Sequence, residues 1–245
     1  MRIADGLHLV ASGATGFDLS HALDCNVFLV TDGSEHHLFD AGAGEDVDGL
    51  IATLRRDGLE PSGLRTLVLT HGHADHSGGA AALVAEIPGL RVVAGPRTAA
   101  ILAAKDERLI SLDRARGRAY PLDYRWTPPA ADQVVEDGVA ISAGPFRFTA
   151  VATPGHSDDH VSWLVEGRGL SALVSGDALF ADGRIILQDI EDCSVSKSLA
   201  SIRKLAGLDF TAFLPGHGRF SLRDGKRHVL AAKRFADAGL PPPQL

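Results

Sequence analysis

The chain has 245 residues, 45% of them hydrophobic and 22% charged, and this globular composition argues against a disordered protein. Its formal net charge of −7 gives no general attraction to a phosphate backbone, so we expect no nucleic acid among its partners. No apolar run reaches the length of a membrane span and no apolar leader opens the chain, so we expect a cytoplasmic protein with no membrane partner. The two cysteines, Cys25 and Cys193, lie far apart and fit free thiols, with one disulfide as the alternative.

The first half of the chain alternates short apolar runs with segments of helical periodicity. Apolar runs bounded by turn residues predict strands at 7–10, 26–30, 38–39, 64–70 and 91–94. The run at 64–70 is typical of a strand covered on both faces. Helical spacing, with a proline suited to a first turn in the last case, predicts helices at 47–56, 80–86 and 97–105. This alternation is typical of a layered α/β fold.

The second half of the chain follows the same pattern. It predicts strands at 146–152, 161–165, 172–175 and 211–214, and helices at 196–206 and 224–238. Residues 106–133, between the halves, are poorly patterned and form an irregular insertion. The aromatic side chains of this insertion either line a substrate pocket or simply pack it. No repeat or linker is visible, so a single domain over 1–245 is the simplest interpretation.

Residues 70–79 carry the densest group of metal-ligand side chains, in the sequence T-H-G-H-A-D-H-S-G-G. Three histidines and one aspartate fall within six residues of this stretch: His71, His73, Asp75 and His76. Neutral imidazoles and a carboxylate suit a borderline divalent cation such as zinc. The stretch follows a predicted strand, so the turn after that strand can gather all four side chains around one small volume. The motif therefore predicts a metal site.

Three further ligand candidates follow other apolar runs, namely His156, Asp177 and His217. The carboxyl ends of strands in a layered sheet share an edge, so separate strand ends can deliver these side chains to one place. Seven candidates are too many for one tetrahedral zinc, which takes four ligands. Two divalent metals that share one carboxylate would use all seven and would lower the pKa of a bridging water.

The ordered motifs T-H-G-H-A-D-H-S-G-G, T-P-G-H-S, S-G-D and P-G-H-G resemble those of the metallo-β-lactamase superfamily, in style closest to its glyoxalase II-like hydrolases. With the strand-end Asp40 they span residues 40–218, which is most of the chain. The resemblance implies an αββα sandwich, with two facing mixed sheets flanked by helices and the site at one edge. It specifies the metal site and says little about the substrate.

The resemblance also implies roles for individual residues. One metal would be held by His71, His73 and His156, and the other by Asp75, His76 and His217, with Asp177 bridging the two. Asp40 matches a buried aspartate behind the ligands, and His160 matches a histidine with a similar supporting role.

We therefore expect a dinuclear metal-dependent hydrolase whose metal-bridging hydroxide attacks a small ester-like substrate, with thioesters and lactones favoured. Asp75 is the expected catalytic residue, because it can pass a proton to the leaving group. The expected cofactors are two divalent ions, zinc first, with iron or manganese as alternatives. The rival functions are a mononuclear iron oxygenase or oxidoreductase on the same fold, a phosphodiesterase, and a non-catalytic binding protein.

The residues that would contact the substrate are less well marked than the metal ligands. Our candidates for the substrate pocket are Tyr120, Tyr124, Phe180 and Arg184. Tyr120 or Tyr124 could act as a donor to a developing oxyanion. The expected partner is a small molecule, and a homo-oligomer is left open.

Overall fold

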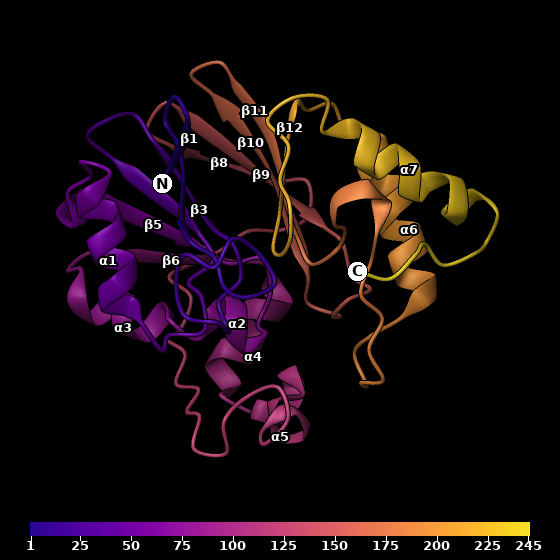
Figure 1. Ribbon diagram of the computed structural model, residues 1–245, viewed down its shortest axis with the longest axis horizontal. Helices are drawn as coiled ribbons and strands as arrows, with labels where there is room; N and C mark the ends of the chain where they lie inside the picture. Colours follow the sequence, from indigo (N-terminus) through magenta and orange to yellow (C-terminus); the bar gives the residue numbers. More distant parts are fainter. The chain divides into compact units, whose positions relative to one another are not determined.

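The computed structural model describes residues 1–245, which divide into two compact units, Met1–Val134 and Val135–Leu245. In Figure 1 the first unit runs from indigo to pink along the chain and the second from pink-orange to yellow. Each unit has its own sheet, and each is described by itself below. That all 245 residues act as a single domain stays a prediction.

The sheet of the first unit has seven strands in the order β1 to β7. These are β1 Arg2–Ala4, β2 Leu7–Ala11, β3 Val27–Thr31, β4 His36–Phe39, β5 Leu64–Val68, β6 Arg91–Ala94 and β7 Gln133–Val134. The strands β1 to β4 pair antiparallel, whereas β4, β5, β6 and β7 pair parallel. Because β4 and β5 run in the same direction, the residues after Phe39 and after Val68 leave the sheet at the same edge.

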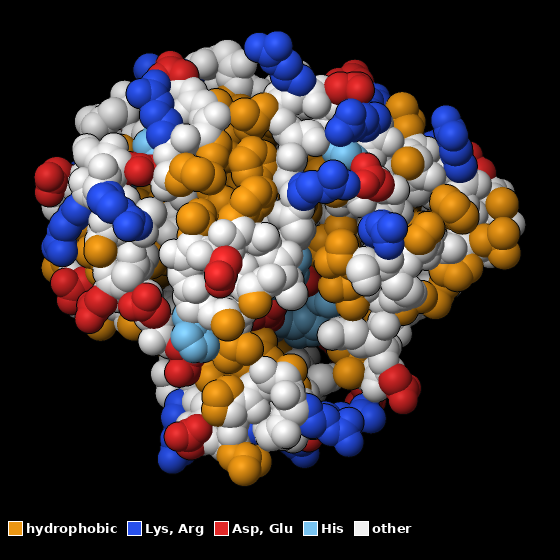
Figure 2. All heavy atoms as spheres, viewed as in Figure 1, with side chains coloured by type: hydrophobic (Ala, Val, Ile, Leu, Met, Phe, Trp, Pro, Cys, Tyr) orange, Lys and Arg blue, Asp and Glu red, His pale blue; other side chains and the backbone are white.

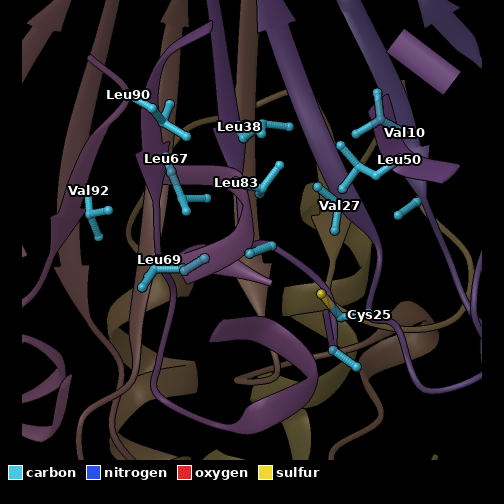
Figure 3. Close-up of a cluster of buried hydrophobic side chains, with 14 of the residues drawn as sticks. Val10, Cys25, Val27, Leu38, Leu50, Leu67, Leu69, Leu83, Leu90 and Val92 are labelled. Carbon is cyan, nitrogen blue, oxygen red and sulfur yellow. The ribbon is translucent and has the colours of Figure 1, made fainter. Parts of the chain in front are cut away.

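Helices of the first unit bury their apolar sides in one cluster. The helices are α1 Val47–Arg56, α2 Ala74–Ser77, α3 Ala80–Glu86, α4 Pro96–Ala104 and α5 Leu112–Ala115, with 3₁₀ turns η1 Pro61–Gly63 and η2 Glu107–Ile110. Figure 3 shows Leu38 and Leu67 from the sheet beside Leu50 of α1 and Leu83 of α3. Cys25 lies in the same cluster and is fully buried. Burial of such side chains contributes roughly 1.5–3 kcal/mol each.

The sheet of the second unit has five strands in the order β12-β11-β10-β9-β8. They are β8 Ala140–Ala143, β9 Phe146–Ala152, β10 Val161–Gly167, β11 Leu170–Gly176 and β12 Ala212–Pro215. The strand β10 pairs antiparallel with both β9 and β11, and β12 pairs parallel with β11. The strands β9, β11 and β12 therefore point the same way, so their carboxyl ends open at one edge.

The helices of the second unit are α6 Val195–Ala206 and α7 Lys226–Asp237, with a 3₁₀ turn η3 Ala181–Gly183. A parallel pair of strands needs a crossover connection, and α6 lies within the crossover from β11 to β12. The helices α6 and α7 pack against each other (Figure 1). Leu205 and Val229 from these helices join Leu173 and Phe213 of the sheet in one buried cluster.

Most predicted elements are present with bounds within three residues of those expected. The bounds of α1, α3, β6 and β9 match the prediction to the residue. The strand expected at 64–70 ends at Val68, and it is not covered along its whole length, because Arg65 is exposed and pairs with Glu35. The predicted irregular insertion contains η2 and α5, and residues 116–132 have no helix or paired strand.

The strands β1, β7 and β8 and the short helix α2 were not predicted. No helix of the structure has both the length and the apolar character needed to cross a membrane. On the face drawn in Figure 2, acidic and basic side chains are interspersed without a wide basic patch.

Candidate metal centre

The first unit gathers one group of candidate ligands in the turn between β5 and α2. The rings of His71 and His73 have centroids 4.6 Å apart, and those of His71 and His76 lie 4.2 Å apart. Asp75 belongs to the same group, because its Oδ2 atom is 3.7 Å from Nε2 of His76. The histidine motif therefore forms a compact set of three imidazoles and one carboxylate within this unit.

Asp40 holds His76 from the end of β4. The Oδ2 atom of Asp40 lies 2.8 Å from Nδ1 of His76, and both side chains are buried. An ionised carboxylate only accepts, so Nδ1 of His76 donates and its Nε2 atom keeps the lone pair that a metal ligand needs. Thr70 donates its backbone N–H to Oδ1 of Asp40 at 2.7 Å and its hydroxyl to Oδ2 at 2.9 Å. These bonds fix the carboxylate that orients His76.

The second unit gathers the other three candidates at the shared edge of β9, β11 and β12. His156 follows β9, Asp177 follows β11 and His217 follows β12. The Nε2 atoms of His156 and His217 each lie 3.5 Å from the same oxygen, Oδ2 of Asp177. This distance exceeds that of an ordinary N–H···O hydrogen bond. Two imidazoles thus present ring nitrogens to one carboxylate oxygen.

His160 supports Asp177 through the backbone. The backbone N–H of Asp177 donates to Nε2 of His160 at 2.9 Å, and Nδ1 of His160 lies 2.9 Å from Oγ1 of Thr153. Since a backbone N–H can only donate, Nε2 of His160 accepts and its proton lies on Nδ1. His160 is therefore a neutral imidazole that supports Asp177. Its Nε2 atom accepts this hydrogen bond and so is not available as a metal ligand.

The loop that carries His156 packs tightly against the start of α6. Gly155 has a φ of +148°, and a Cβ atom at this position would lie 2.5 Å from the backbone nitrogen of Ser198. The backbone N–H of Ser194 donates to the Gly155 carbonyl at 2.7 Å. Only glycine allows so close an approach, so this residue sets how near the loop lies to α6.

Three aromatic residues of the insertion bond to the histidine motif within the first unit. The Tyr120 hydroxyl donates to Oδ1 of Asp75 at 3.0 Å, and Nε1 of Trp126 donates to Oγ of Ser77 at 2.9 Å. The Tyr124 hydroxyl donates to the carbonyl of Ala43 at 2.7 Å and lies 3.3 Å from that of Ala74. Burial and the Asp75 charge raise the pKa of both phenols, which therefore stay protonated as donors at neutral pH.

The four candidates for the substrate pocket have different surroundings. Phe180 is buried, with its ring 6.2 Å from that of His217. Arg184 is exposed, and its guanidinium donates to the carbonyl of Gln244 at 2.6 Å. Tyr120 is partly buried, whereas Tyr124 is buried with its hydroxyl committed to backbone carbonyls. A contact with substrate stays a prediction for all four.

Sequence reasoning gave no role to two residues that support the candidate ligands, Thr70 and Thr153, and it placed Trp126 only among the aromatic side chains of the insertion. The two threonines stand inside the motifs T-H-G-H and T-P-G-H, within two residues of the end of β5 or β9, so their place in the motif was a usable signal. Trp126 bonds to a residue 49 positions away, and no local pattern marks such a contact.

The chemistry of the donor set fits a divalent metal. All seven candidates offer imidazole nitrogen or carboxylate oxygen, and the two units hold them in compact groups of four and three. Zinc, iron and manganese all accept such ligands. The partners Asp40 and His160 supply the hydrogen bonds that commonly stand behind metal ligands.

Solved structures with the same fold are metallo-β-lactamases. One from Cronobacter sakazakii with a HARLDQ motif superposes with a TM-score of 0.74 at 21% identity, covering 98% of this chain and 91% of that one. FEZ-1 from Legionella gormanii gives a TM-score of 0.71 at 18% identity, covering 97% and 94%. At these identities the likeness shows the fold alone, and it confirms the predicted fold class.

The family is shown by the sequence as well. The chain belongs to the metallo-β-lactamase superfamily, whose family model matches residues 22–217. "Thioesterase pkgB" of Emericella nidulans is 28% identical over 193 residues, which is 79% of this chain and 45% of that protein. "Atrochrysone carboxyl ACP thioesterase" of Aspergillus fumigatus is 28% identical over 194 residues, or 79% and 50% of the two chains. The chain thus spans about half the length of these curated relatives.

Proposed function

We propose that this protein is a metal-dependent hydrolase that uses all seven candidate ligands to bind two divalent ions. The observation that carries the proposal is the approach of His156 and His217 to one oxygen of Asp177, at 3.5 Å each. A carboxylate oxygen shared by two imidazoles is suited to lie between two cations. The histidine motif of the first unit supplies four more donors of the same chemical kind.

The proposed assignment divides the ligands between the two ions. One ion would be held by His71, His73 and His156, and the other by Asp75, His76 and His217, with Asp177 shared. Zinc is the proposed metal, with iron and manganese as alternatives. When bound, such a pair supplies Lewis acidity toward a carbonyl oxygen and lowers the pKa of water.

The side chains themselves hold ligands in place and move a proton. Asp40 fixes the proton of His76 on Nδ1, and His160 fixes the backbone of Asp177. We propose that Asp75 delivers a proton to the leaving group, which makes it the one catalytic residue among the ligands.

The proposed substrate is a small molecule with an ester-like bond, a thioester or a lactone. Two relatives named as thioesterases support the thioester class. Hydrolysis of either substrate breaks the bond between the acyl carbon and the sulfur or oxygen, and water supplies the hydroxyl and the proton. We further propose a cytoplasmic setting, consistent with the two free cysteines.

Metal analysis and a substrate panel test the proposal together. Elemental analysis of the purified protein should give two metal equivalents per chain. Turnover should be found with an N-acetylcysteamine thioester or an N-acyl homoserine lactone, and not with bis(p-nitrophenyl) phosphate or a β-lactam. His71→Ala and Asp177→Ala should lose metal and at least about 10³-fold in rate. His21→Ala, which removes a histidine outside the motifs, is the matched control.

Two outcomes would overturn this function. Full metal content and activity in His71→Ala and Asp177→Ala would remove the ligand assignment. One iron per chain with oxygen uptake, measured on anaerobically purified protein, would instead show the oxygenase alternative.

A further inference from the structure

The hydroxyl of Tyr120 lies against both the side chain and the backbone of Asp75. It donates to Oδ1 of Asp75 at 3.0 Å, and the backbone amide of Asp75 bonds to the same phenol oxygen. An ordinary phenol is protonated at neutral pH, so its single proton is committed to this carboxylate. Tyr120 therefore contacts Asp75 at both its carboxylate and its backbone amide, although the two residues are 45 positions apart.

The insertion fixes Tyr120 independently of Asp75. Its carbonyl accepts from the N–H of Gly117 at 2.7 Å, and its ring centroid lies 4.8 Å from that of Tyr124. Arg116, in the same turn, makes two hydrogen bonds to the Glu107 carboxylate, at 2.8 and 2.7 Å, and also donates to the Tyr124 carbonyl. Because its own turn already holds Tyr120 in place, the Tyr120 hydroxyl can orient the flexible carboxylate of Asp75. The position of Tyr120 does not depend on Asp75.

The two oxygens of Asp75 consequently have different surroundings. The Oδ1 atom is taken by the Tyr120 hydroxyl, whereas Oδ2 lies 3.7 Å from Nε2 of His76. Nε2 is the nitrogen that Asp40 leaves with a lone pair, because Asp40 holds the proton of His76 on Nδ1. One carboxylate oxygen and one imidazole lone pair are thus presented side by side.

We infer that Tyr120 is a positioning residue, which makes Asp75 a one-oxygen ligand through Oδ2 and so strengthens binding of the ion held by Asp75 and His76. This inference rests on the proposed function, in which these two residues bind a metal. It also assigns the phenol a task other than substrate contact, because a donor to an oxyanion would have to release Asp75. Partners behind a metal ligand are commonly worth about 10- to 100-fold in metal affinity.

The test is the metal affinity of Tyr120→Phe, which keeps the ring and removes the hydroxyl. Metal-free protein is titrated with Zn²⁺ in competition with a chromophoric chelator, which resolves the two equivalents. We expect one equivalent to weaken by about 10- to 100-fold and the other to keep its wild-type affinity. The visible spectrum of the Co²⁺-substituted protein should change as well, because Asp75 can then offer both oxygens.

Tyr124→Phe is the matched control. It removes a phenol of the same insertion, but one that donates to backbone carbonyls and to no candidate ligand side chain. This control should lower the melting temperature and leave both Zn²⁺ affinities unchanged. A double-mutant cycle with Asp75→Ala, which removes the oxygen that accepts from Tyr120, separates positioning from general support, because Tyr120→Phe should cost no further affinity once this acceptor is gone.

Wild-type affinity for both equivalents in Tyr120→Phe would overturn the inference, and so would an equal loss in the Asp75→Ala background. If Tyr120→Phe fails to fold by circular dichroism, Tyr120→Leu takes its place in the same titration. Failure of the proposed function has a different signature, since the wild-type chain would then bind no stoichiometric metal or a single iron with oxygen uptake.

Discussion

Asp40 shows how much of the first ligand group depends on one side chain that is not a candidate ligand. Its two oxygens accept the backbone N–H and hydroxyl of Thr70 and the Nδ1 proton of His76, at 2.7, 2.9 and 2.8 Å. Its φ of +64° lies in the left-handed region, which aspartate and asparagine adopt more readily than other side chains. The residue type is thus constrained both by its backbone and by its three donors.

Asp40→Asn should weaken metal binding without removing a ligand. Asparagine has the same size and tolerates the positive φ. However, both oxygens of Asp40 accept hydrogen bonds from Thr70 or His76, so the NH₂ group of asparagine would face a donor in place of one of these oxygens. We expect about 10- to 100-fold lower affinity for one Zn²⁺ equivalent and a loss of roughly 1–3 kcal/mol in unfolding free energy. Zn²⁺ titration and urea denaturation measure the two. Asp46→Asn, an exposed helix cap where asparagine serves equally well, should change neither.

At the scale of elements, the start of α6 and the loop that carries His156 are built around Gly155. The loop accepts a backbone hydrogen bond from Ser194, and the position leaves no room for a side chain beside Ser198. The helix is therefore part of what positions His156, although it contributes no candidate ligand.

Gly155→Ala should cost more stability than a substitution at a glycine with open surroundings. Gly169 also has a positive φ, +80°, but nothing lies within 4 Å of a Cβ atom there. Gly169→Ala should cost about 1–2 kcal/mol from backbone strain alone. Gly155→Ala should cost more, about 2–5 kcal/mol, because α6 must also move away and overpacking adds about 1–3 kcal/mol to the backbone strain. Equal costs in urea denaturation would contradict the role given to this contact.

Elements that carry their own pattern were predictable from the sequence, and elements that depend on a neighbour were not. The helix α1 places Leu50, Ile51 and Leu54 on one face, and its predicted bounds were correct. The strands β1, β7 and β8 are two to four residues long and exist through pairing with a neighbouring strand. Too few side chains mark such short edges.

The candidate site likewise has residues that the sequence predicts and contacts that it does not. Ligand types such as His71 and Asp177 stand in short motifs after apolar runs, so the sequence displays them directly. The contacts of Tyr120 and Trp126 join residues 45 and 49 positions apart, and only the folded chain reveals them. Residues 106–133 offered two interpretations, and the structure shows three of their aromatic side chains bonded to the motif region.

At the scale of the whole molecule, buried histidines outside the candidate site should make stability depend on pH. Burial lowers the pKa of His36 and His228, and it lowers that of His37 to about 4. The unfolded chain, with a histidine pKa near 6.5, therefore binds protons more readily than the folded protein between pH 6.5 and about 4. The contribution of these histidines to the free energy of unfolding is therefore fully present above pH 6.5, and it is lost as the pH falls through this window.

His37→Leu should reduce this acid sensitivity. The lowering of the His37 pKa from 6.5 to about 4 corresponds to roughly 3 kcal/mol at most of unfolding free energy, and this contribution is lost between pH 6.5 and about 4. Urea denaturation of the metal-free protein at pH 8, 6, 5 and 4 should show a shallower decline in the variant than in the wild-type chain. An identical pH dependence in the two proteins would contradict the assignment to His37.

The burial of Cys25 has a practical consequence for chemical labelling. Cys25 is inaccessible in the core of the first unit, whereas Cys193 is partly exposed and neither thiol is in a disulfide. A maleimide should therefore modify the folded protein once, at Cys193, and twice after denaturation, as intact mass spectrometry would show. The natural sequence thus supplies a single attachment point for a fluorophore in the segment after Asp177, with no cysteine needing removal.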